Sequence, residues 1–216
     1  MRSRTRLISA VALVAALSGC ASEGSLVVDE TVGIRSVLSS CPTVGIPEYT
    51  GDITTFRTAG DRSAANMDVT ATITNLRETC DESSERVYAN ATFDVLARRT
   101  DTRGARTVTL PYFSTVVRGG TAVQSKRVGN VTLTFADGQE RAQASAQAGA
   151  FINRAEATLP AEIRERITRK RKAGDIDAAL DPLADTEVRE ALRRASFELL
   201  VGFQLDQSQL AYNATR

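Results

Sequence analysis

The stretch VYANATFDVLA, residues 87–97, decides the fold. Successive side chains of a β-strand point to opposite faces, so apolar residues at every second position predict a strand with one buried face. Two sets of side chains alternate here: Val87, Ala89, Ala91, Phe93, Val95 and Ala97 in one, and Tyr88, Asn90, Thr92, Asp94 and Leu96 in the other. No other segment of the chain alternates as cleanly.

Further extended segments lie on both sides of this stretch. Glycine pairs and Asp-Gly pairs between such segments are typical of hairpin turns. The segments are 68–79, 107–117, 122–128 and 131–135, with turn signals at Gly119-Gly120 and Asp137-Gly138.

The alanine-rich residues 142–152 follow the second turn signal. Alanine has the highest intrinsic helix propensity, so a helix is one interpretation. Alternation of alanine with Gln143, Ser145 and Gln147 directly after a turn favours a strand instead. Pro111 interrupts the segment 107–117 and predicts an edge strand or a bulge, because proline lacks the N–H that a ladder needs. An open edge can accept a strand from a partner; an aromatic core contact with a local kink is the alternative.

Beyond Pro160 the apolar period lengthens, which predicts helices near 161–172 and 182–195. Alternation returns at 197–205 and predicts a last strand, and 207–216 reads as a short tail. Strands joined by short turns predict a mainly β chain: an antiparallel β-sandwich of immunoglobulin- or fibronectin-like type, with a small two-helix insertion before the last strand. We assign residues 41–216 to this single domain.

The N-terminus has the features of a secretory signal peptide. Three arginines precede an apolar run at 7–17, and the small residues Ser18 and Gly19 precede Cys20. The run is too short for a membrane-spanning helix, which needs about 20 apolar residues. We therefore expect residues 1–19 to be removed on export.

The motif LSGC, residues 17–20, resembles the lipobox of bacterial lipoproteins. The resemblance implies cleavage before Cys20, attachment of lipid to its thiol, and a tether over residues 20–40. An ordinary signal peptide with a chance cysteine is the alternative. Ala21, rather than aspartate, after the cysteine favours the outer membrane facing the periplasm. The whole chain is similar to uncharacterised lipoproteins of high-GC proteobacteria, in the stretches CPTVGIPEYTGDITTF, LPYFSTVVRGG and FELLVGFQLDQSQLAYN; this similarity implies no activity.

The chain has three cysteines. With Cys20 lipidated, Cys41 and Cys80 remain, and an oxidising periplasm favours a disulfide between them. Closing a loop of this length stabilises by about 3–4 kcal/mol in the chain-entropy model. Two buried free thiols are the alternative.

Composition excludes several classes of function. The chain has no histidine, which excludes Ser-His-Asp and Cys-His nucleophile systems and zinc sites that need imidazole. Loss of Arg2, Arg4 and Arg6 with the leader lowers the basic count from 27 to 24, against 26 acidic residues, so a nucleic-acid partner is not expected. The acids Asp175, Asp177, Asp181 and Asp185 lack the glycine and final glutamate of an EF-hand loop, and helix capping suits them better than metal binding. No cofactor or metal is expected.

A basic run is the most conspicuous surface feature: Arg164, Arg166, Arg169, Lys170, Arg171 and Lys172. It is a candidate contact for an anionic partner such as lipid phosphates; a solvated helix face is the alternative. From these features we expect a non-enzymatic, lipid-anchored envelope protein that contacts the membrane through Cys20 and binds another envelope protein. A module that binds envelope glycan or a small ligand is the alternative, though aromatic residues make up only 5% of the chain and tryptophan is absent.

Overall fold

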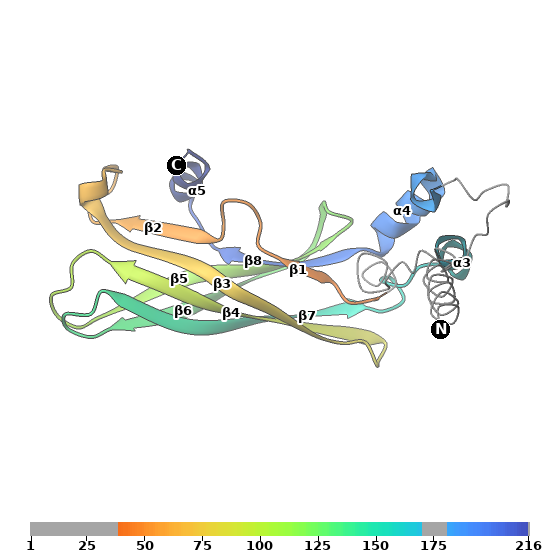
Figure 1. Cartoon of the computed structure of the whole chain (residues 1–216), viewed down its shortest axis with the longest axis horizontal. Helices are drawn as coiled ribbons and strands as arrows, with labels where there is room; N and C mark the ends of the chain where they lie inside the picture. The colour runs from red at the N-terminus through yellow and green to blue at the C-terminus, as the bar shows by residue number, and fades with distance from the viewer. Residues whose placement is uncertain (1–38, 170–180, 216) are drawn as a thin grey trace, which may run out of the picture. The chain divides into compact units, whose positions relative to one another are not determined.

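The computed structural model describes residues 39–169 and 181–215. Strands of two four-stranded sheets make up the largest part of this region, with a few short helices (Figure 1). The mainly β prediction is confirmed. The predicted signal peptide, Cys20, most of the tether and residues 170–172 of the basic run lie outside the described residues.

The two sheets have the strand orders β1-β8-β5-β6 and β2-β3-β4-β7. The strands are β1 (Thr43–Gly45), β2 (Asp52–Phe56), β3 (Met67–Asp81), β4 (Arg86–Arg99), β5 (Arg106–Arg118), β6 (Ala122–Phe135), β7 (Arg141–Asn153) and β8 (Phe197–Phe203). The helical segments are η1 (Ala64–Asn66), α3 (Ala161–Thr168), η2 (Pro182–Ala184), α4 (Thr186–Ala195) and α5 (Gln207–Thr215).

The connectivity departs from two details of the prediction. Strands β1 and β8 pair in parallel, whereas the other neighbouring strands are antiparallel. In an immunoglobulin domain the second strand lies beside the fifth. Here β2 lies beside β3 and β3 beside β4, so consecutive strands form a meander within one sheet.

The inner face of β4 lies at the centre of the core. All six alternating residues from Val87 to Ala97 are buried, as the sequence predicted. The opposite sheet supplies Leu133, Phe135, Val201 and Phe203 to the same cluster. The two sheets therefore share one core between their inner faces.

A bulge in β3 changes which of its residues face the core. The register shifts between Thr74 and Arg77, and Asn75 takes a φ of 52°. Beyond the bulge Cys80 pairs with Ala89 of β4, whose side chain points inward, so Cys80 points inward too. There it forms a disulfide with Cys41, just before β1 of the other sheet, across a Cα–Cα distance of 6.1 Å. The predicted disulfide is confirmed, and it joins the two sheets.

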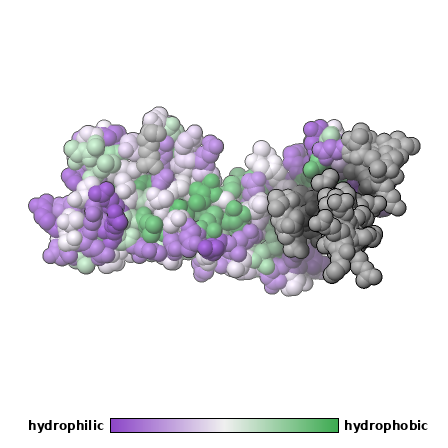
Figure 2. Space-filling model, viewed as in Figure 1, coloured by the Kyte–Doolittle hydropathy of each residue, from purple (hydrophilic) through white to green (hydrophobic). Residues whose placement is uncertain are grey.

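The flank that this disulfide closes is apolar. Val44 of β1 and Leu76 of β3 are partly buried against the core. Figure 2 shows apolar residues gathered near the middle of the visible face, around the start of β2.

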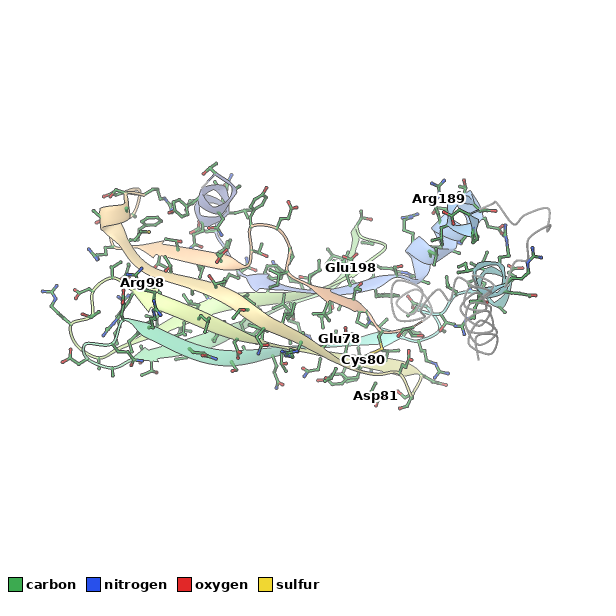
Figure 3. All side chains as sticks on the ribbon, in the orientation of Figure 1. Glu78, Cys80, Asp81, Arg98, Arg189 and Glu198 are labelled. Atoms are coloured by element: carbon green, nitrogen blue, oxygen red, sulfur yellow. A yellow bond between two sulfur atoms is a disulfide. The ribbon has the colours of Figure 1, made fainter. Side chains whose placement is uncertain are left out.

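Glu78 lies two residues before Cys80 on β3 (Figure 3), and burial raises the pKa of its carboxyl group.

Residues 142–152 form a strand, β7, rather than a helix. Its pairing with β4 is unbroken from Arg86↔Asn153 to Arg98↔Arg141. Ala148, Ala150 and Ile152 are buried, so alternation, not the helix propensity of alanine, determines the structure here.

The two predicted helices before the last strand are present as α3 and α4, although α3 ends at Thr168 and residues 170–180 are outside the described region. Ile163 of α3 packs with Val188 and Ala191 of α4 in a small separate cluster. Asp185 caps α4 by accepting hydrogen bonds from the backbone N–H groups of Glu187 and Val188.

The C-terminal residues form helix α5, where the sequence predicted a tail. Asp206 and Gln209 form a reciprocal capping box: each side chain accepts a hydrogen bond from the other residue's backbone N–H, at 2.8 and 3.0 Å. The ring of Tyr212 packs edge-on against Phe56 of β2. Asn213 donates to the carbonyl oxygens of Tyr49 and Asp52, which holds the helix against β2.

The largest fully buried side chain is charged. Arg99, at the end of β4, has no exposed surface. Its guanidinium donates to the carbonyl oxygens of Thr102, Gly104, Ala136 and Gln139 at 2.7–2.8 Å. These carbonyls belong to the β4–β5 and β6–β7 loops, so Arg99 joins two loops at one end of the sheets. Arg99 was not predicted from the sequence to have this role.

Candidate functional site

Strand β6 forms one edge of its sheet, and half of it lies outside the core. Val131, Leu133 and Phe135 are buried, but every residue at 122–128 is exposed. The facing edge of the other sheet is β7. Residues 136–140 link β6 directly to β7, so the two sheets are joined at this end of the β6–β7 edge. At the opposite end of that edge, residues 122–128 of β6 contribute no buried side chain.

Tyr112 marks the point where β6 leaves the core. Its ring packs edge-on against Phe93 at 5.2 Å between centroids, and its hydroxyl donates to the Gln147 carbonyl of β7 at 2.8 Å. The ring covers Gly129 of β6 so closely that a Cβ there would lie 2.6 Å from Tyr112 Cζ. Burial raises the pKa of the Tyr112 phenol. Tyr112 thus spans from β5 to β7 and closes the core at this position.

Beyond Tyr112 a cleft of about 140 Å³ opens between β6 and β7. Its floor includes Ser114, Val116 and Leu199, from β5 and β8 of one sheet. The remaining lining residues are Ser125 and Arg127 of β6, Arg86 of β4, and Gly149, Ala150 and Phe151 of β7. The cleft is therefore polar at its walls and partly apolar at its floor.

The side of β6 that faces away from β5 carries backbone groups without a ladder partner among the described residues. The N–H and C=O of one strand residue point to the same side, and Gln204 N donates to Pro111 O on the β8 side of β5. Pro111 therefore makes no ladder bond to Asn130, its neighbour on β6. The N–H and C=O of Asn130 therefore point away from β5, to the free edge. Because backbone direction alternates along a strand, the N–H and C=O of Val128 and Lys126 also point to the free edge.

Pro111 lies where β5 has only one ladder neighbour. Strand β8 ends at Phe203, which pairs with Tyr112, so the missing N–H of Pro111 removes no ladder bond. The prediction that Pro111 marks an edge strand is wrong for β5, which lies between β8 and β6. The alternative, an aromatic contact with the core beside the proline, is present as Tyr112 against Phe93. The strand that is an edge along its whole length is its neighbour β6.

Two arginines give the cleft a positive charge. No acidic residue lines it, and among residues 39–169 and 181–215 no carboxylate forms an ion pair with Arg86 or Arg127. The Arg86 guanidinium lies 4.6 Å from the centre of the Phe151 ring. Phe151 in turn packs against Tyr88 on the outer face of the sheet, at 4.8 Å between centroids.

The predicted basic run is only partly described. Arg164 and Arg166 lie on α3 and Arg169 follows it, whereas Lys170, Arg171 and Lys172 lie outside the described residues. Arg166 donates to Glu187 and Asp185 at 2.7 and 2.6 Å, and these contacts raise its pKa. This side chain connects α3 to α4, and the anionic-partner contact stays a prediction for all six residues.

The acids considered for metal binding are helix caps where they are described. Asp181 accepts from Leu183 N at the start of η2, and Asp185 caps α4. Within the described part of the chain no group of three or more Cys, Asp or Glu side chains is arranged to hold a metal ion. Asp175 and Asp177 lie outside it.

The cleft residues were missed by the sequence analysis, although β6 contains a signal. Its inward positions are apolar at Val131, Leu133 and Phe135 and polar at Ser125 and Arg127. A strand whose inner face changes from apolar to polar at a glycine indicates where it leaves a core. No family model, curated protein or solved structure matches the chain.

Proposed function

We propose that the protein is a lipid-anchored, non-enzymatic component of the bacterial envelope that binds an extended segment of another envelope protein along β6. The observation that carries this proposal is the free edge of β6, where the backbone groups of Lys126, Val128 and Asn130 have no described partner. Addition of a strand to an exposed sheet edge gives affinity through main-chain hydrogen bonds. Side chains of the added strand that point inward would enter the cleft beside β7.

The two sheets would serve as a sandwich module in the manner of immunoglobulin- and fibronectin-like binding domains, although the strand order differs. The non-enzymatic assignment rests on the sequence, which has no histidine and pairs no nucleophile with a base. Among the described residues, the two pKa values raised by burial belong to Glu78 and Tyr112, on separate strands.

The anchor limits where a partner can be. The chain between Cys20 and Cys41 spans at most about 70 Å when fully extended, and Cys41 is fixed to β3 by the disulfide. No helix in the described residues is long and apolar enough to cross a membrane. Attachment through lipid at Cys20 is part of this proposal, and Cys20 lies outside the described residues.

Replacing Cys20 by serine should abolish membrane attachment. The wild-type protein should take up labelled palmitate and sediment with membranes, because more than one acyl chain anchors a protein stably. The variant should incorporate no label and remain unprocessed or soluble. Unlabelled wild-type protein in the soluble fraction would show that the LSGC motif is not a lipobox.

Replacing Val128 by proline should weaken binding at the free edge. Proline removes the N–H that points away from β5 and leaves the ladder to β5 intact, while Val128→Ala keeps the N–H and serves as the matched control. A photo-crosslinking residue at position 124, on the same edge, reports contact in intact cells. We expect an adduct in the wild type and in Val128→Ala, and a several-fold smaller yield in Val128→Pro, since one hydrogen bond contributes about 1 kcal/mol. An equal yield in all three variants would contradict strand addition at β6.

Glycan binding remains the second candidate because Tyr88 and Phe151 are exposed, and a surface hollow of about 820 Å³ is lined by Arg86 and Asn153 of the same two strands. The rings of Tyr88 and Phe151 are inclined by 40° and pack against each other. Arg86 covers one of them, so they do not present a flat platform to a sugar ring. The free β6 edge is the stronger observation.

A further inference from the structure

We infer that the segment bound by β6 is acidic and places one carboxylate in the cleft that Arg127 and Arg86 line. This inference rests on the proposed strand addition and names the chemistry of the partner. Arg127 is the register partner of Ser114, which is buried on the inner face of β5, so its side chain lies on the inner side of the sheet. Every second residue of a strand added beside β6 would point to that same side.

The volume of the cleft favours a single side chain as its occupant. Pockets that enclose a small-molecule ligand have volumes of about 300–1,000 Å³, and this cleft has about 140 Å³. Ser125 and Arg127 of β6 are among its lining residues, so the cleft lies against this edge strand. A side chain carried by a strand on that edge would therefore enter the cleft without displacing core residues.

The charges of the cleft select the kind of side chain. Its lining residues include Arg86, Arg127, Ser114 and Ser125 and no acid. Arginine presents parallel N–H donors that match a carboxylate, and a charged partner strengthens each bond. The Arg86 guanidinium is already placed against the Phe151 ring. A carboxylate is thus the group that satisfies the unused donors and neutralises the charge.

The same charges argue against a second copy of this chain as the occupant. The exposed half of β6, AVQSKRVGN at residues 122–130, carries Lys126 and Arg127 and no acid. An antiparallel β6–β6 pair would bring the basic residues of two copies together, and like charges opposite each other destabilise a sheet. A segment with acidic residues at alternate positions is complementary to this edge.

The test is a selection from random 12-residue peptides displayed on phage, against the full mature protein in detergent. Wild-type protein should enrich peptides with β-branched residues and a central Asp or Glu. In a selected peptide, Glu→Gln should lower affinity about tenfold, because a hydrogen bond to a charged group is stronger than a neutral one. This difference should shrink at high salt.

Charge reversal at the cleft then tests the residue assignment. Arg127→Glu should shift the selection to peptides with a central Lys or Arg, whereas Arg141→Glu should keep the acidic preference. Arg141 is an exposed arginine on the other edge strand, paired with Arg98 at the closed end. Both variants should keep the thermal transition of the wild type. A change of preference in Arg141→Glu as large as that in Arg127→Glu overturns the assignment.

The outcomes separate this inference from the proposed function. Peptides that bind wild-type protein, lose affinity in Val128→Pro and show no preference for acid would overturn the carboxylate inference and leave strand addition supported. Peptides that bind equally to wild type and Val128→Pro would overturn both. Selection of acidic peptides that Arg127→Glu reverses supports both.

Discussion

Replacing Arg99 by methionine should lower the free energy of unfolding by about 3–5 kcal/mol. The guanidinium donates to four carbonyl oxygens in two loops, at 2.7–2.8 Å, and is fully buried. Methionine fills a similar space and donates no hydrogen bond, so buried carbonyl groups would lose their partners. Each unsatisfied buried group costs about 1–3 kcal/mol, which outweighs the removal of a buried charge.

Lysine at position 99 should not restore stability. Its ammonium has three donors from one atom, whereas the planar fork of arginine reaches acceptors on separate loops. The loops contact each other here too, since Asp137 accepts from Gly104 N and Gly138 N donates to Thr102 O. We therefore expect Arg99→Lys to lose most of the free energy of unfolding that Arg99→Met loses.

Arg98→Met is the matched control, because Arg98, labelled in Figure 3, is the adjacent residue of β4 and is exposed where Arg99 is buried. Its side chain is 66% exposed and pairs with Glu140. Exposed ion pairs contribute about 0–1 kcal/mol, so unfolding by urea should be nearly unchanged. Equal midpoints for Arg98→Met and Arg99→Met would show that the buried guanidinium does not hold the two loops.

The position of Arg99 follows from the sequence, but its role does not. The inner set of β4 ends at Ala97, and continuing the period of two places residue 99 on the buried face. An arginine there needs acceptors, because a buried charge without partners is strongly unfavourable. Those acceptors are backbone carbonyls near residues 102 and 139, and no side-chain pattern marks backbone acceptors.

Alternation of apolar side chains predicted the strands β4 and β7, and the longer apolar period predicted helix α4. The capping box of Asp206 and Gln209 was also visible in the sequence and would have predicted α5. The parallel pairing of β1 with β8 was not predictable in this way. β1 has three residues, and its register with Glu198 depends on packing between distant parts of the chain.

The candidate site shows the same division. Polar residues at the inward positions of β6 were readable in the sequence, but the identity of the edge strand depends on the order of all four strands in the sheet. Arg86 reaches the cleft from β4, in the other sheet. Its proximity to Arg127 is a consequence of how the two sheets pack, which no local pattern encodes.

Removing the disulfide should cost about 4 kcal/mol. Cys41 and Cys80 are separated by 39 positions, and the chain-entropy model gives about this value for a loop of that length. Cys41→Ser with Cys80→Ser is preferable to either single change, because a single change leaves a thiol that can pair with another molecule. The double variant should unfold at a lower temperature, and a reducing agent should lower the transition of the wild type but not that of the variant.

Most of this loss should arise in the unfolded chain rather than from detachment of the N-terminal segment. Ser40 N donates to Glu82 at 3.0 Å, and the hydroxyl groups of Ser40 and Thr158 are 3.3 Å apart, so polar contacts still hold residues 39–41 to the end of β3 and to the chain after β7. Backbone hydrogen exchange in β1 should therefore be protected in the double variant under native conditions. Rapid exchange in β1 at a temperature where β4 remains protected would instead show that the disulfide is needed to keep β1 paired with β8.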